Sequence, residues 1–184
     1  MLKQNVLRTL ELTVTPYCNV NCEMCYATKL RNRKRKLLTP RDYRNIWLQA
    51  KKLGAFSVVL SGGEPTTRKD LFQIVEALEP RKTTIGIVSN SILLDRNFLI
   101  RLKKCGLTVL HLSLNSVDPE ENDRERDFPG HFEKVNQVIR DGKDLGFEVC
   151  LSTVVSHNEL DRMINMVQFA AKQEIGVVFS LACP

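Results

Sequence analysis

The chain has 184 residues, of which 43% are hydrophobic and 26% are charged, with 9 glycines and 7 prolines. This composition is that of a globular protein and excludes disordered, collagenous and coiled-coil chains. The length predicts a single domain over residues 1–184. No apolar run approaches the roughly 18 residues that span a bilayer, and the N-terminal segment lacks the apolar stretch of a secretory signal. We therefore expect a cytoplasmic protein without a membrane partner.

The net charge is +6, with 27 Lys and Arg against 21 Asp and Glu. The excess lies in one run, Lys29 to Lys36, which holds six cations. No aromatic residue interrupts this run, as stacking on bases would require. We interpret the run as a solvated loop or helix end and expect no nucleic-acid partner, although an anion-binding patch stays open as an alternative.

Short segments rich in Val, Leu, Ile and Thr alternate along the chain with longer segments of helical periodicity. We expect Thr39 to N-cap a helix that begins at Pro40, and Gly54, Gly106 and Gly146 to follow helix ends. The predicted strands are residues 10–15, 57–61, 84–89, 108–115, 148–155 and 176–181. The predicted helices are residues 40–53, 69–78, 96–105, 132–145 and 159–173.

The alternation of strands and helices predicts parallel strands with right-handed crossovers, in an open sheet or a barrel. The strand patterns favour a barrel. In the fourth strand, Leu110, Leu112 and Leu114 alternate with His111 and Ser113. A sheet covered by helices on both sides tends to be apolar throughout, so the polar face indicates a lumen. We predict an α/β fold, a partial (βα)6 TIM-type barrel with a polar lumen and helices outside.

Three of the six cysteines form a CxxxCxxC motif, Cys18, Cys22 and Cys25, directly after the first predicted strand. In barrels of parallel strands, the reacting groups lie on loops at the C-terminal ends of the strands. Three thiolates can bind three irons of a [4Fe–4S] cluster and leave the fourth iron open. Structural zinc normally has four protein ligands, and no second CxxC is present. This spacing therefore favours a cluster over zinc.

A second motif, Ser61-Gly62-Gly63-Glu64-Pro65, directly follows the second predicted strand. Its two glycines allow the main chain to approach a ligand closely, and Glu64 adds a carboxylate. Alone, the segment is typical of an ordinary turn. Its place beside the cysteine loop indicates instead that it belongs to a ligand site.

The two motifs together resemble the radical S-adenosylmethionine (SAM) superfamily. Residues 18–25 match its CxxxCxxC motif, and residues 61–65 match its GGEP motif. Residues 110–119 look like the family's SLDS-DPE segment, Asp123 with Arg126 resembles the D-x-x-R that follows it, and residues 151–155 resemble its LNTVV segment. The likeness covers nearly the whole chain and is greatest to peptide maturases, sulfatase-maturing enzymes and molybdenum-cofactor enzymes.

This resemblance implies a radical SAM enzyme in which Cys18, Cys22 and Cys25 hold a [4Fe–4S] cluster whose open iron binds SAM. An electron from a flavodoxin or ferredoxin type of donor cleaves SAM to methionine and a 5′-deoxyadenosyl radical, which abstracts hydrogen from a substrate. The substrate is unknown, with a peptide and a small molecule both open. The implied SAM-binding residues are Met24, Gly62, Gly63, Glu64, Pro65, Ser89, Asn90, Ser113, Asn115, Arg126 and Leu181.

Within that set, the resemblance implies that the glycines and Glu64 meet the methionine amino group and that Arg126 pairs with the carboxylate. Ser113 and Asn115 would face the ribose or carboxylate. Met24 stands where the family often has an aromatic residue whose main chain touches adenine, and Leu181 would pack on the adenine face, with Val154 as a weaker candidate. Asn115 stands where many relatives have Asp.

Other residues have a structural and a functional interpretation. His111 is expected to face the lumen as a hydrogen-bonded core residue or a catalytic one, and Glu11 to form a salt bridge or bind a substrate cation. Tyr26 packs on the cluster or begins a helix. Cys105, Cys150 and Cys183 stand alone and are typical of small core residues, although Cys183 is also a candidate cluster ligand.

The sequence assigns no catalytic residue and no oligomeric state. A rival hypothesis is a non-catalytic iron–sulfur or zinc-binding module, in which the cysteines serve structure or electron transfer. The GGE segment, Ser113 and Arg126 favour the enzyme, because a structural metal site needs none of them.

Overall fold

The structure, a computed structural model, describes residues 7–25, 36–156 and 159–182. Tyr26, Cys183 and residues 29–35 of the basic run lie outside the described residues, so the predictions made for them are not addressed. No helix in the described ranges combines the length and the apolar character needed to cross a membrane.

Strands and helices alternate along the chain as the sequence predicts, and their ends are marked by the expected residues. Thr39 caps α1 together with Asp42, and Pro40 is its first residue. Gly54, Gly106 and Gly146 have positive φ angles at or just after helix ends. The elements are β1 (Thr9–Thr15), α1 (Pro40–Lys52), β2 (Ser57–Gly62), η2 (Pro65–Thr67), α2 (Leu71–Ala77), η3 (Pro80–Lys82), β3 (Thr84–Ser89), α3 (Arg96–Cys105), β4 (Val109–Ser113), α4 (Pro119–Arg126), α5 (His131–Asp144), β5 (Glu148–Val155), α6 (Leu160–Gln173) and β6 (Gly176–Leu181).

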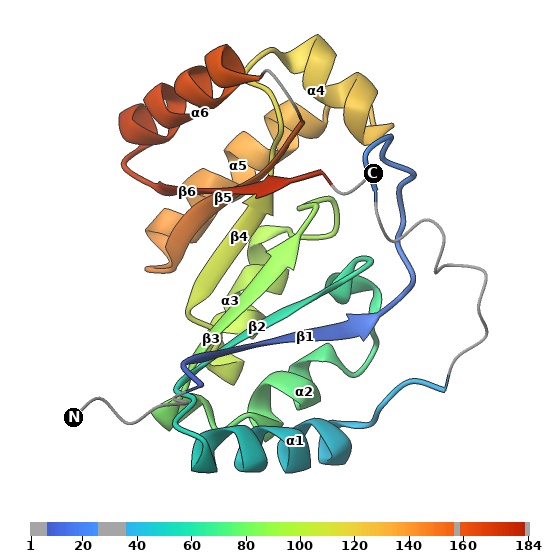
Figure 1. Cartoon of the computed structure of the whole chain (residues 1–184), viewed down its shortest axis with the longest axis vertical. Helices are drawn as coiled ribbons and strands as arrows, with labels where there is room; N and C mark the ends of the chain where they lie inside the picture. Colours follow the sequence, from blue (N-terminus) through green and yellow to red (C-terminus); the bar gives the residue numbers. More distant parts are fainter. Residues whose placement is uncertain (1–6, 26–35, 157–158, 183–184) are drawn as a thin grey trace.

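The strands form one parallel sheet in the order β1-β2-β3-β4-β5-β6. Each strand therefore pairs with its sequence neighbours, and the helices between them return the chain along one side of the sheet (Figure 1). All C-terminal strand ends meet at one edge, where the chain leaving β1 runs toward α4 (Figure 1). The predicted partial barrel with parallel strands and outer helices is confirmed.

The hydrophobic core lies between the outer face of the sheet and the helices. Leu110 and Leu112 of β4 are fully buried there, as are Trp47 of α1 and Leu99 of α3. This packing of apolar strand faces against amphipathic helices supplies most of the apolar area removed from water. The other face of the sheet lines the lumen.

The lumen is polar only in part. Its lining alternates polar residues with valines from the same sheet face: Glu11, Val59, Ser61, Val88, His111, Ser113, Ser152, Val154, Val178 and Ser180. The polar positions that the sequence predicted in β4 do face the lumen, whereas β2, β3, β5 and β6 each add a valine.

One α-helix of the described chain, α4, was not predicted from the sequence, nor were the single-turn helices η2 and η3. Its eight residues, PEENDRER, contain no apolar side chain, so hydrophobic periodicity is absent. The signals were at its start: Asp118 accepts a hydrogen bond from the main chain of Glu121, and Pro119 is the first helical residue. Capping rather than periodicity therefore specifies this helix.

Candidate active site

A cavity of about 380 Å³ opens at the C-terminal edge of the sheet and extends into the lumen. It is lined by the loop after β1, the turns after β2 and β3, the end of α4 and the lumen face of the strands. Most of the residues predicted to bind the cluster or SAM line it: Cys18, Cys22, Met24, Cys25, Gly62, Gly63, Glu64, Ser89, Asn90, Ser113, Arg126 and Leu181. The structure therefore brings these positions, distant in sequence, to one cavity.

Hydrogen bonds fix the cysteine loop at the mouth of this cavity. The main-chain N–H of Glu23 donates to the carbonyl of Glu125 at 3.1 Å, and Cys22 Sγ lies 3.7 Å from the carbonyl oxygen of Arg126. From the β3 side, Asn90 Nδ2 lies 3.7 Å from Cys18 Sγ. The loop is thus held between the end of α4 and the turn after β3.

The two glycines after β2 allow close packing against the start of the same loop. Gly63 N–H donates to the carbonyl of Thr15 and Glu64 N–H to the carbonyl of Tyr17, each at 2.7 Å. A Cβ on Gly62 would lie 2.3 Å from the carbonyl oxygen of Thr15, and one on Gly63 would lie 2.2 Å from that of Tyr17. The glycines therefore allow the main chains of two loops to come into contact. The sequence interpretation had instead expected this close approach to be made to a ligand.

Glu64 is buried and ties the turn after β2 to the turn after β3. Its Oε1 accepts hydrogen bonds from Thr66 N (3.1 Å), Thr66 Oγ1 (2.6 Å) and Ser89 Oγ (2.9 Å). Its Oε2 accepts one, from Asn90 N at 2.7 Å. Burial raises the pKa of Glu64, and these hydrogen bonds oppose that rise. Since a carboxylate oxygen accepts two hydrogen bonds readily, Oε2 has capacity for one more donor from the cavity.

We expect Glu64→Gln to lower the free energy of unfolding by about 1–3 kcal/mol, because an amide placed there turns one acceptor into a donor and leaves a buried N–H of Thr66 or Asn90 unpaired. Urea titration of the variant measures this loss, and Glu133→Gln, on an exposed face of α5, is the matched control. Equal stability of both variants would show that the four hydrogen bonds contribute nothing.

Arg126, at the end of α4, is a buried cation that faces the cavity. Only 7% of its surface is exposed. Its Nη2 donates to Asn115 Oδ1 at 2.6 Å, whereas Nε is buried without a hydrogen-bond partner. Burial lowers the pKa of its guanidinium, and the neighbouring Cys22 acts in the opposite direction. A buried charge with an unsatisfied donor is costly unless a ligand completes it, so Arg126 is suited to an anionic group in the cavity.

Two predicted SAM-binding residues do not line the cavity. Pro65 is buried as the first residue of η2. Asn115 is fully buried behind Arg126, where Oδ1 accepts hydrogen bonds from Arg126 Nη2 and from Val154 N at 3.1 Å. Its Nδ2 points to Met24 Sδ at 3.4 Å and Glu125 Oε2 at 3.2 Å. Asn115 thus holds the guanidinium of Arg126 and is not among the residues that line the cavity.

A buried histidine that the sequence interpretation missed connects both sides of the cavity. His131, the first residue of α5, is fully buried. Its Nδ1 lies 3.0 Å from Asn122 Nδ2, and its Nε2 lies 3.0 Å from the carbonyl oxygen of Asn90. Because Asn122 Oδ1 accepts from Asn115 N, its Nδ2 must donate to Nδ1, and the ring proton resides on Nε2. Through Asn122 the ring is connected to Asn115, which bonds Arg126. Through the carbonyl oxygen of Asn90 it is connected to the turn that Glu64 holds.

We expect His131 to make the protein less stable in mild acid. Burial lowers the pKa of His131 to about 4. Between pH 6.5 and 4 the unfolded chain binds a proton that the folded chain does not, so stability falls as the pH falls through this window, by about 3 kcal/mol in total. Urea titrations from pH 7 to 4.5 measure the free energy of unfolding of the wild type and of His131→Gln. The two free energies should converge as the pH falls, because only the wild type loses stability through this histidine. Parallel curves would contradict this assignment.

Comparison with known proteins decides the family. Residues 12–170 match the family model of the radical SAM superfamily. The chain belongs to the radical SAM superfamily. It is 30% identical over 170 residues to the GTP 3′,8-cyclase of Aquifex aeolicus, covering 89% of this chain and 52% of that protein. It is 26% identical over 174 residues to the AdoMet-dependent heme synthase of Methanosarcina barkeri, covering 95% and 49%.

The fold also matches a solved structure. SuiB of Streptococcus suis, in its structure bound to S-adenosylmethionine, superposes with a TM-score of 0.82 at 22% identity, over 98% of this chain and 42% of that one. This match confirms the partial barrel. The chain spans about half the length of the two curated relatives it matches. The resemblance on which the sequence interpretation depends is therefore confirmed at the level of the superfamily.

Radical SAM proteins use SAM and an iron–sulfur cluster, and the cavity residues fit both. Among the described residues, no three His, Cys, Asp or Glu side chains are gathered tightly enough for a single metal ion. A [4Fe–4S] cluster does not require the three thiolates to meet at one point, because each cysteine binds a different iron. The unpaired Nε of Arg126 and the spare acceptor of Glu64 Oε2 match the carboxylate and amino groups of SAM in charge.

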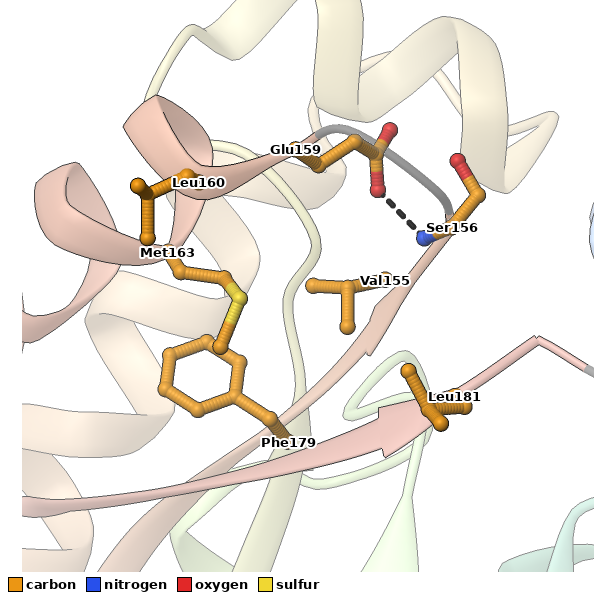
Figure 2. A pocket seen from close by; sticks show the side chains of 7 residues that line it. All are labelled: Val155, Ser156, Glu159, Leu160, Met163, Phe179 and Leu181. Carbon is orange, nitrogen blue, oxygen red and sulfur yellow. Dashed lines mark hydrogen bonds between the residues drawn. The ribbon is translucent and has the colours of Figure 1, made fainter.

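The remaining predicted residues lie in the lumen, among the packing residues and near the end of β6. His111 lines the lumen, as predicted, and forms no hydrogen bond to another residue in the described part of the chain. Cys150 is buried and Cys105 half-buried, as expected of small packing residues. Leu181 is 78% exposed and also lines a second hollow of about 440 Å³, between the end of β6 and α6 (Figure 2).

Proposed function

We propose that this chain is the core of a radical SAM enzyme in which Cys18, Cys22 and Cys25 bind a [4Fe–4S] cluster. When bound, the cluster would supply the electron for reductive cleavage of SAM to methionine and a 5′-deoxyadenosyl radical, which would abstract hydrogen from a substrate. The observation that carries the proposal is that the three cysteines, the GGE turn and the buried Arg126 all line one cavity.

Within this proposal, the chain binds and orients SAM by charge complementarity. Arg126 Nε donates to the methionine carboxylate, and Asn115 holds the guanidinium in place. Glu64 Oε2 accepts from the methionine amino group while its other oxygen fixes the turn. Ser89, Asn90 and Ser113 stay proposed as contacts of the ribose side, and Met24 and Leu181 as contacts of the adenine side. Gly62 and Gly63 shape the turn, and their carbonyl groups supply further acceptors.

The electron is proposed to come from a flavodoxin or ferredoxin type of donor, and the protein to act in the cytoplasm. The substrate class is not set by family membership. Relatives are named as a GTP 3′,8-cyclase and a heme synthase, and a structural neighbour is described as bound to a precursor peptide. These names differ in substrate, so they do not select a substrate for this chain.

The rival function, a non-catalytic iron–sulfur or zinc module, has no use for the unpaired Nε of Arg126. A buried guanidinium with an unpaired Nε destabilises the fold unless a ligand compensates it. Arg126 also lies beside Cys22, so its charge alone would suit thiolates in either kind of site. The unpaired Nε is what favours the enzyme, because the carboxylate of SAM would give it a partner.

The test is product formation by the reconstituted chain. Protein loaded anaerobically with iron and sulfide, then mixed with SAM and dithionite, should form 5′-deoxyadenosine, detected by mass spectrometry. Cys22→Ser is the control and should lack both the cluster and the product. A fully loaded cluster that yields no 5′-deoxyadenosine would favour the rival.

A further inference from the structure

The deep part of the lumen carries three polar groups that SAM binding does not use. Glu11 of β1, Ser61 of β2 and His111 of β4 all line the cavity. The strand register places the three residues at neighbouring heights along the barrel axis. Ser61 pairs with Thr13 of β1, and His111 pairs with Val88 of β3. Glu11 lies two residues before Thr13 on β1, so it is the next residue of that strand to face the lumen. They face the same lumen from three strands.

None of these three groups has a hydrogen-bond partner in the described part of the chain. Ser61 is only 4% exposed, and its Oγ is buried without a partner. The carboxylate of Glu11 and the ring of His111 form no hydrogen bond or ion pair there. A buried hydroxyl without a partner is rare in native proteins and calls for an explanation. A ligand in the lumen provides one.

The imidazole of His111 lies against Gly86 of β3. A Cβ on Gly86 would lie 3.4 Å from both Cδ2 and Nε2 of His111, so the ring leans over β3 toward the strands that carry Ser61 and Glu11. Burial lowers the pKa of His111, while the carboxylates of Glu148 and Glu11 oppose that effect. Near neutral pH the ring is therefore neutral and offers one nitrogen as an acceptor.

The chemistry of this group of residues selects a cation. It consists of a carboxylate, a hydroxyl oxygen and a neutral imidazole, all of which accept hydrogen bonds, and a primary ammonium has three donors and no acceptor. Among the described residues that line the cavity, Arg126 is the one permanent cation, and it lies at the rim beside Cys22. An anionic group such as a triphosphate would meet the carboxylate of Glu11 there and no cation among the described lining residues.

We propose that Glu11, Ser61 and His111 form a substrate subsite that binds a protonated primary amine. The proposal rests on the proposed function, because the occupant of this subsite is the molecule whose hydrogen is abstracted. The amine is attached to an alkyl chain that is long enough to extend from the subsite toward the rim of the cavity. A lysine side chain and a free alkylamine both have this form.

The test compares the affinities of small molecules that have similar five-carbon chains and differ in the charge of the end group. Calorimetric titrations of SAM-loaded holoprotein with n-pentylamine, 1-pentanol and valerate measure the charge preference directly. We expect pentylammonium to bind about tenfold or more tightly than pentanol, and valerate more weakly still. Nα-acetyl-lysine methylamide in the same series distinguishes a lysine side chain from a free alkylamine, and Glu11-dependent binding of either supports the subsite.

Variants identify the residue responsible. Glu11→Gln should remove the preference for pentylammonium over pentanol, whereas Glu133→Gln, on the exposed face of α5, should keep it. Equal binding of the two probes to the wild type, or an unchanged preference in Glu11→Gln, would overturn the subsite. Formation of 5′-deoxyadenosine in the same preparations is scored separately. Its absence with an intact amine preference would overturn the proposed function and leave the subsite standing.

Discussion

Arg126→Met should weaken SAM binding by roughly 10- to 100-fold while the cluster still loads. A charge-assisted hydrogen bond contributes about 1.5–3 kcal/mol, which corresponds to that range of affinity. Met has a similar volume and removes a buried cation whose Nε has no partner. The variant without SAM should therefore be as stable as the wild type or more stable, because an uncompensated buried charge disfavours folding.

Two measurements on the same preparation separate the possible roles of Arg126. SAM affinity is read by equilibrium dialysis, and stability by urea titration of the protein without SAM. Because Arg126 also lies beside Cys22, iron and sulfide content is measured as a control. An equal loss of cluster and SAM affinity would contradict the assignment and make Arg126 a support for the cysteine loop.

Gly63→Ala should displace the cysteine loop and reduce cluster loading. The new Cβ would lie 2.2 Å from the carbonyl oxygen and 2.5 Å from the carbonyl carbon of Tyr17. Main-chain atoms cannot rotate away as a side chain can, so the loop start must shift, at a cost of about 1–3 kcal/mol. The shift also weakens the hydrogen bond from Glu64 N to Tyr17 O. Cys18, the next residue, moves with it.

Gly130→Ala is the control for a glycine replacement. Gly130 has a φ of 82°, and a Cβ there meets no atom within 4 Å. Its cost is therefore the backbone strain of a left-handed residue alone, about 1 kcal/mol, with no effect on the cysteine loop. Iron and sulfide analysis after reconstitution should show a loss in Gly63→Ala and wild-type content in Gly130→Ala. Equal content in both would show that the close contact is not required.

The sequence predicted the fold well because the barrel repeats one simple pattern. Each strand between Thr9 and Leu181 is short and rich in branched residues, and all but one of the helices have an apolar face. Helix α4 was missed because it packs through polar and charged residues: Arg162 of α6 pairs with Glu121 and Glu125 of α4 at 2.8 and 2.9 Å. Hydrophobic periodicity cannot detect a helix that is held by ion pairs.

At the site, motif spacing identified the residues that line the cavity. It did not identify the buried residues that hold those side chains in place. The cysteines, the GGE turn and Arg126 line one cavity, as predicted. Alternation along β4 predicts Asn115 on the lumen side, but the strand ends at Ser113 and Asn115 does not line the cavity. His131 carries no local motif, and its partners Asn90 and Asn122 lie 41 and 9 residues away. Only the folded chain shows that network.

The central claim is that the three cysteines hold a cluster with one iron open to SAM. Electron paramagnetic resonance of the dithionite-reduced, reconstituted chain tests it most directly. We predict the signal of a [4Fe–4S]⁺ cluster, absent in Cys22→Ser, whose spectrum changes when SAM is added. A cluster signal that stays unchanged at saturating SAM, or one that persists in Cys22→Ser, would contradict the account.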